Sequence, residues 1–287
     1  MSDSASSQLT VIRPRGSWLQ VDWRGLFEYR DLLFLLVRRD FLSRYKQTVL
    51  GPAWFVLQPL VTTFVFTIVF SRALGVSTAG VPGPLFYLSG LLGWSYFASL
   101  VGATGSSFIQ NAAVFGKVYF PRLLVPIGIA CSQAITFALQ LVTFLVVLGF
   151  HVWTDRFDVS MSQVLFGIMC APALLLHMAL LGLGVGLVMA SLTAKYRDLQ
   201  HMIGFLVQIV MYSSPVIYPF SRLPENFQLL ASFNPMATVV ENTRAAFLGT
   251  ATLPLPYQFI SMSVAVMIFI FGILLFQRTA RTFIDTV

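Results

Sequence analysis

The sequence predicts an all-α membrane protein with six membrane-spanning helices, and three observations lead to this prediction. Hydrophobic residues fill 57% of the 287 positions and charged residues only 10%, whereas a soluble domain carries about 25% charged residues. The mean hydropathy is +0.80. Six apolar stretches approach the roughly 20 residues that a helix needs to cross a bilayer. A water-soluble enzyme or binding domain is therefore excluded.

The predicted spans divide the chain into a cytoplasmic segment, residues 1–52, and one six-span domain, residues 53–287. The fifth span is the shortest, and Pro215 and Pro219 predict that its helix breaks before the far side of the membrane, because proline removes a backbone donor. In the fourth span, Gly182 and Gly186 form a GxxxG motif, which permits close packing within one chain or between two copies. The six predicted spans are residues 53–73, 85–105, 123–150, 164–191, 202–217 and 259–276.

The distribution of positive charge predicts the orientation. Of the 18 Lys and Arg residues, all but four fall on the side of the two termini. Because segments rich in Lys and Arg stay in the cytoplasm, we expect both termini there. The same distribution explains the net charge of +7 without nucleic acid as a partner. The four residues on the other side are Arg72, Arg156, Arg222 and Arg244.

Residues 27–47 predict an amphipathic helix that lies along the membrane surface. Phe34, Val37, Phe41 and Tyr45 recur at helical spacing on one face. A basic helix of this kind rests among lipid headgroups with its apolar face turned inward. The pattern leaves open whether the helix only anchors the chain or also docks a partner. Its charged positions are Arg38, Arg39, Asp40, Arg44 and Lys46.

The loop between the second and third spans also carries a helical pattern. Phe108, Ala112 and Phe115 recur at helical spacing, with Lys117 and Arg122 just beyond them. The spacing predicts a short cytoplasmic helix, or simply a connector.

The long external segment, residues 218–257, predicts a short helix that dips into the outer leaflet. Asn234 before Pro235 has the signature of a helix start, and Gly249 supplies a stop. The polar positions within this helix need partners in the protein or a watery opening. Glu241 and Arg244 could simply pair with each other or take part in gating.

The cores of the six spans contain no Asp, Glu, Lys or Arg. Because charged residues inside a membrane normally mark ion pathways, a proton- or sodium-coupled carrier is disfavoured. The sequence also lacks GxSxG, HExxH and GxxxxGK[ST] motifs and a His–carboxylate cluster. We therefore expect no catalytic residue, metal site or cofactor in this chain, and any motor must be another polypeptide.

Four motifs in order resemble the ABC-2 type permeases that export polysaccharides such as O-antigen, capsule and teichoic acid. The resemblance runs from about Gly25 to the carboxyl terminus. The motifs are RRDFLSRYKQTVLGPAWFVLQPL at residues 38–60, KVYFPRLLVPI at 117–127, KYRDL at 195–199 and NPM at 234–236.

The resemblance implies a homodimer in the bacterial inner membrane that exports an undecaprenyl-type lipid-linked polysaccharide through a channel at the dimer interface. It also implies two copies of a nucleotide-binding subunit, which bind ATP and Mg²⁺. The implied external gate comprises Asn234, Glu241, Asn242 and Arg244. The residues implied to couple to the ATPase are Arg38, Arg39, Asp40, Arg44, Tyr45, Lys46, Asn111, Phe115, Lys117 and Arg122.

Aromatic residues in the first two spans fit such a channel, because sugars stack their C–H faces on rings. Two alternatives remain open. One is a membrane-embedded enzyme acting on lipid-linked sugars, with Asp155, Asp158 or Glu241 as its carboxylate; the other is an ABC-2 permease for a small lipophilic solute. The candidate channel-lining residues are Phe64, Phe66, Tyr87, Trp94, Tyr96 and Phe97.

Overall fold

The computed structural model describes residues 23–43, 46, 48–115 and 120–282. Within these residues all regular structure is helical and no strand occurs, in agreement with the predicted all-α class. The elements are α1 (Trp23–Glu28), α2 (Arg30–Ser43), η1 (Gly51–Ala53), α3 (Trp54–Phe66), η2 (Thr67–Ala73), α4 (Gly83–Gly105), α5 (Ser107–Gln110), α6 (Ala112–Phe115), α7 (Leu124–Trp153), α8 (Met161–Lys195), α9 (Leu199–Tyr212), η3 (Phe220–Arg222), α10 (Glu225–Ser232), α11 (Pro235–Leu248) and α12 (Leu255–Thr282).

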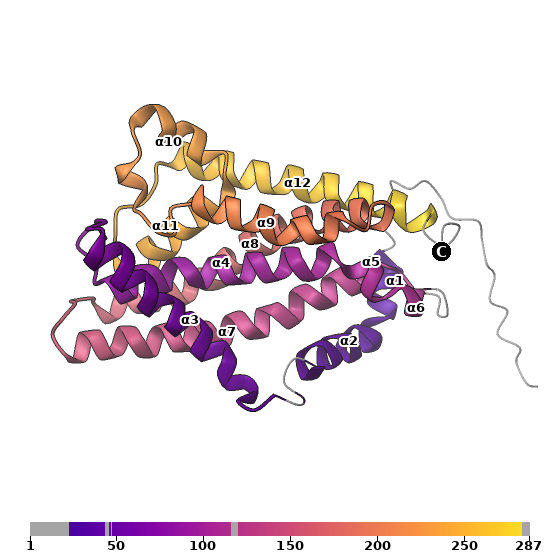
Figure 1. Ribbon diagram of the computed structural model, residues 1–287, viewed down its shortest axis with the longest axis horizontal. Helices are drawn as coiled ribbons and strands as arrows, with labels where there is room; N and C mark the ends of the chain where they lie inside the picture. Colours follow the sequence, from indigo (N-terminus) through magenta and orange to yellow (C-terminus); the bar gives the residue numbers. More distant parts are fainter. Residues whose placement is uncertain (1–22, 44–45, 47, 116–119, 283–287) are drawn as a thin grey trace, which may run out of the picture.

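The long helices run side by side along the longest axis of the molecule (Figure 1). The short helices α1, α5 and α6 lie near one end, with α2 beside them, and α10 and α11 lie near the other (Figure 1). We call these the α2 end and the α11 end. The last turns of α12 lie at the α2 end, so the described part of the chain starts and finishes at the same end of the bundle (Figure 1).

Five segments of the described chain are long and apolar enough to cross a membrane: Gly51–Ala73, α4, α7, α8 and α12. They overlap five of the six predicted spans. The predicted fifth span corresponds to α9, which has 14 residues and ends at Tyr212. At 1.5 Å per residue this helix is about 21 Å long, shorter than a hydrocarbon core of about 30 Å. The helix thus stops before Pro215, as predicted, and helix length alone supports five crossings rather than six.

Helix α4 is the centre of the bundle. In the most apolar 18-residue stretch of α4, 78% of the residues are buried, against 6% in the corresponding stretch of Gly51–Ala73. It packs against α3, α7, α8, α9 and α11. Helix α3 lies on the outside and crosses α4 and α7 obliquely (Figure 1). Side chains of α4 therefore face protein on nearly every side, whereas most of α3 is free to face lipid or another subunit.

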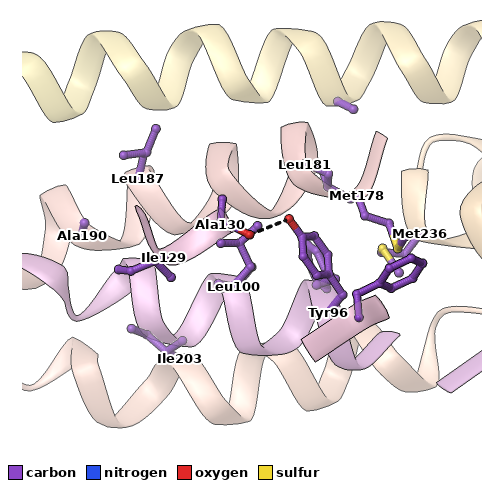
Figure 2. Packing of buried hydrophobic residues seen from close by; sticks show 14 of the residues in the cluster. Tyr96, Leu100, Ile129, Ala130, Met178, Leu181, Leu187, Ala190, Ile203 and Met236 are labelled. Atoms are coloured by element: carbon purple, nitrogen blue, oxygen red, sulfur yellow. Dashed lines mark hydrogen bonds between the residues drawn. The ribbon is translucent and has the colours of Figure 1, made fainter. Parts of the chain in front are cut away.

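Polar side chains in α4 find partners on α7. The Tyr96 hydroxyl points at α7 and donates to the Ala130 carbonyl at 3.4 Å (Figure 2). Ser95 Oγ donates to Gln140 Oε1 at 2.6 Å. In an apolar bundle such bonds fix which faces of two helices meet, because an unpaired polar group would be costly there.

The GxxxG motif of α8 packs within the chain. A Cβ on Gly182 would lie 2.9 Å from Leu100 Cδ2, and one on Gly186 would lie 2.7 Å from Thr104 Cβ. Both neighbours belong to α4, so the two glycines let α8 approach α4 closely. Thr193 adds a bond at the same contact, its hydroxyl donating to the Gly105 carbonyl at 2.7 Å.

Helix α2 packs against α7 through Leu33 and Leu36. Of the predicted apolar face, Val37 and Phe41 are half-buried, but Phe34 is not packed. Leu36 is buried, and a Cβ on Gly128 of α7 would lie 3.5 Å from Leu36 and 3.6 Å from Leu33. Phe34, placed on the predicted apolar face, is 69% exposed. The packed positions and the predicted face are both apolar in sequence, and Gly128 on α7 lies against Leu33 and Leu36. Tyr45 lies outside the described residues.

Candidate functional site

Helix α11, at the α11 end, is enclosed by the rest of the chain. Every residue of this helix except Asn242 is buried, including Glu241 and Arg244. It packs against α8, α4, α12 and α10. The predicted helix signals are confirmed: Asn234 Oδ1 accepts from the Met236 N–H at 3.1 Å, and Gly249 ends the helix with φ +67°. A helix that carries polar side chains is thus buried on nearly all sides.

Arg244 is the most deeply buried cation of this region, with 1% of its surface exposed. Its Nη1 lies 2.9 Å from Glu241 Oε1, which confirms the pairing that the i, i+3 spacing allowed. The other oxygen atoms that accept hydrogen bonds from the guanidinium are backbone carbonyls. Nη1 donates to the Pro215 carbonyl at 2.6 Å, and Nη2 donates to the Val216 carbonyl at 2.9 Å.

The same guanidinium also reaches α4. Nη2 lies 3.5 Å from the Phe86 carbonyl, and the Arg244 Cζ lies 3.6 Å from the centre of the Phe86 ring. Cations are attracted to the faces of aromatic rings, more strongly when water is excluded. The carboxylate of Glu241, 2.9 Å from Nη1, balances the charge of this buried guanidinium.

Glu241 extends this cluster to a further segment. Its Oε1 accepts from the Phe220 N–H at 3.0 Å, at the start of η3. One ion pair on α11 thus touches α4, the chain after α9 and η3. Of the four predicted gate residues, Glu241 and Arg244 are brought together directly, Asn234 starts the same helix, and Asn242 lies half-buried on its remaining face.

Both ends of α11 are hydrogen-bonded to other parts of the chain. At its start, Asn234 Nδ2 donates to Ser214 Oγ at 2.9 Å. At its end, Gln163 Nε2 of α8 donates to the carbonyls of Ala245 and Ala246, each at 2.8 Å. Sequence reasoning did not identify Gln163 or Ser214. The one signal for Gln163 is an amide beside the start of a predicted span.

Two of the residues implied to couple to an ATPase meet at the α2 end. Arg39 Nη2 of α2 donates to Asn111 Oδ1, between α5 and α6, at 3.1 Å. Beside them, the Arg122 guanidinium lies 5.9 Å from the centre of the Phe115 ring. Arg38 and Lys46 are exposed, and Asp40 is half-buried. The remaining members, Arg44, Tyr45 and Lys117, lie outside the described residues.

Most of the aromatic residues proposed for a channel lie inside the subunit. Tyr87, Trp94, Tyr96 and Phe97 are each at most 6% exposed. Phe66 is half-buried and meets Tyr87 edge to face at 5.9 Å. Phe64, on α3, is 65% exposed. In this conformation the rings of α4 stabilise the core, and lining a channel would require neighbouring helices to move away from them.

The carboxylates considered for an enzyme are not assembled into a site. Asp155 and Asp158 are exposed, whereas Glu241 is held in the ion pair with Arg244. Within the described residues, no group of three or more His, Cys, Asp or Glu side chains could hold a metal ion.

The chain is similar along most of its length to membrane proteins of known role. The sequence model of the ABC-2 type transporter family matches residues 31–248. The chain is 26% identical over 255 residues to the O-antigen export system permease protein RfbA of Klebsiella pneumoniae, covering 89% of this chain and 94% of that protein. It is 28% identical over 228 residues to RfbA of Myxococcus xanthus, covering 78% and 83%. It is 24% identical over 248 residues to the polysialic acid transport protein KpsM of Escherichia coli, covering 86% and 92%.

Proposed function

The chain belongs to the ABC-2 type transporter family, and we propose that it is the membrane subunit of an ABC transporter that exports a lipid-linked polysaccharide across the bacterial inner membrane. The observation that carries this proposal is the similarity, over most of the chain, to permeases named for O-antigen export and polysialic acid transport. The chain has no GxxxxGK[ST] phosphate loop. ATP and Mg²⁺ would therefore bind to a separate nucleotide-binding subunit, which supplies the energy.

We place the contact with that subunit at the α2 end, which would face the cytoplasm together with both termini. The hydrogen bond between Arg39 and Asn111 supports this placement, because it joins the amphipathic helix to the loop after the second span. A displacement of α2 or of the loop would be transmitted to the other element through this hydrogen bond. The remaining coupling residues of the described chain, Arg38, Asp40, Lys46, Phe115 and Arg122, lie on the same two elements or next to them.

Two copies of the chain would form the transporter, with the channel between them. The mostly exposed apolar surface of Gly51–Ala73 supports a further subunit contact on that side, and Phe64 is placed to offer a ring to a sugar there. In this arrangement α9 and the segment up to α11 supply the sixth crossing. The external gate would be built around α11, with Asn234, Glu241, Asn242 and Arg244.

The direct test is a gene deletion in the source bacterium combined with purification from its membranes. We expect the deletion strain to accumulate an undecaprenyl-linked glycan in the cytoplasm and the tagged chain to co-purify with a nucleotide-binding subunit. The chain alone should show no ATP hydrolysis, and the complex should hydrolyse ATP. Normal glycan export in the deletion strain, together with retention of a small lipophilic solute, would favour the alternative substrate class and overturn this proposal.

A further inference from the structure

The chain that follows α9 is buried although it is not helical. Ser214 and Val216 are fully buried, and Ile217 is 8% exposed. Because the helix does not continue past Tyr212, the carbonyl oxygens of the following residues lack the N–H groups that a longer helix would supply. Unpaired carbonyls are costly away from water, and non-helical backbone at membrane depth is tolerated only where protein satisfies it.

Arg244 supplies the missing donors from a different helix. Its two terminal nitrogen atoms donate to the carbonyls of Pro215 and Val216, at 2.6 and 2.9 Å. Within the described part of the chain, no backbone N–H donates to either oxygen. The planar guanidinium carries its donors in a fixed fork, which suits two neighbouring acceptors better than the single ammonium of lysine does.

The surroundings are shaped to hold this guanidinium. A Cβ on Gly90 of α4 would lie 3.0 Å from Arg244 Nη2 and 3.3 Å from the Val216 carbonyl. Gly90 therefore leaves room for both the cation and the carbonyl that it binds. On the other side, Glu241 balances the charge and binds the Phe220 N–H.

We propose that Arg244 is a positioning residue that takes the place of backbone donors at the end of the fifth apolar segment, so that residues 213–217 and α11 are held to α4 as one unit. In transport, α11 then serves as the fixed part of the external gate, and neighbouring segments move against it. This last step rests on the proposed export function. The competing explanation is that Arg244 only neutralises Glu241.

The test measures how readily buried positions of α11 become accessible, by the reaction rate of a cysteine introduced on that helix. Cys131 and Cys170 are first replaced by Ala, and Thr238→Cys is introduced as the probe. Thr238 is fully buried on α11, and within the described residues its hydroxyl has no hydrogen-bond partner, so the exchange removes no bond. The rate of reaction with N-ethylmaleimide is measured on the full complex in lipid nanodiscs.

We expect Arg244→Met to raise this labelling rate by about tenfold or more, because buried carbonyls lose their donors. Arg244→Lys should give an intermediate rate. Arg222→Met is the matched control, since Arg222 is an exposed arginine of the same external segment, and it should label like the parent. If Arg244→Met does not accumulate in the membrane, Arg244→Lys carries the same comparison. Labelling of both variants at the parent rate overturns the proposal.

A double variant separates the two explanations. In Arg244→Met with Glu241→Gln, no uncompensated charge remains, but the carbonyls of Pro215 and Val216 still lack their donors. We expect fast labelling, as in Arg244→Met alone. A return to the slow parent rate would show that charge neutralisation is the whole role of Arg244 and would overturn the proposal.

Glycan export is measured in parallel in whole cells. We expect export to fall in Arg244→Met and Arg244→Lys and to be unchanged in Arg222→Met. Fast labelling with unchanged export would overturn the role of Arg244 in transport. If the parent complex itself exports no glycan, the proposed function fails, whereas the labelling rates still decide what Arg244 holds in place.

Discussion

Gly184 of α8 and Gly272 of α12 bring two helix backbones into direct contact. A Cβ on Gly272 would lie 2.5 Å from the Gly184 carbonyl oxygen, and a Cβ on Gly184 would lie 2.7 Å from the backbone nitrogen of Phe269. Such distances leave no room for a side chain on either residue. The same helix α8 presents Gly182 and Gly186 to α4. Alternate glycines therefore let one helix pack closely on two others, which is a common device in membranes, where small residues promote helix association.

Gly272→Ala should destabilise the protein by about 1–3 kcal/mol, because the added methyl group meets backbone that cannot move aside. Thermal unfolding of the purified protein in detergent measures the effect. Gly102→Ala on α4 is the control, since a Cβ there meets nothing within 4 Å. It should leave the unfolding temperature unchanged or raise it slightly, because alanine favours helix. Equal unfolding temperatures for the two variants would contradict the close contact of α8 and α12.

Removing the bond between Arg39 and Asn111 should lower transport-coupled ATP turnover without preventing membrane insertion. We expect Arg39→Ala and Asn111→Ala each to reduce turnover, and the double variant to be little worse than the stronger single one, because both remove the same contact. The measurement is ATP hydrolysis by the assembled complex. Arg30→Ala, an exposed arginine of the same helix α2, is the control. Strictly additive losses would show that the two residues act independently.

Gln163→Glu should loosen the end of α11. The substitution keeps the shape of the side chain but replaces its donor with oxygen, which faces the carbonyls of Ala245 and Ala246. We expect the free energy of unfolding to fall by about 1–3 kcal/mol, because these buried acceptors lose their donor. Thermal unfolding is the measurement, and Gln110→Glu, at an exposed position of α5 outside the apolar spans, is the matched control. An unfolding temperature equal to that of the control would rule out an anchoring role for Gln163.

Asn234 makes two separable contributions. Asn234→Ala removes both the helix cap and the bond to Ser214, whereas Asn234→Asp keeps an oxygen that can cap Met236 but removes the amide donor. The cap is worth about 1 kcal/mol, so we expect unfolding temperatures in the order parent, Asn234→Asp, Asn234→Ala. Asn242→Ala, on the half-buried face of α11, serves as the control. Asn234→Asp as unstable as Asn234→Ala would assign the whole effect to the bond with Ser214.

The sequence by itself determined the helical membrane class, five of the apolar crossings, the early end of the fifth apolar segment and the start and stop of α11. Each depends on neighbours along the chain. An apolar run of sufficient length favours a spanning helix, Asn234 bonds a backbone group two residues away, and Gly249 adopts a left-handed conformation through its own lack of a side chain. The pairing of Glu241 with Arg244 is equally local, because helical geometry places residues three apart on one face.

Only the tertiary structure decided which partners distant residues find. Arg244 meets the carbonyls of Pro215 and Val216 because α4, with Gly90, brings the chain after α9 against α11. The apolar pattern of α2 likewise did not indicate that Leu33 and Leu36 would pack at Gly128 of α7. In a chain whose helices are apolar nearly all round, periodicity cannot distinguish a surface that meets protein from one that meets lipid, and close approach and hydrogen bonding make that distinction.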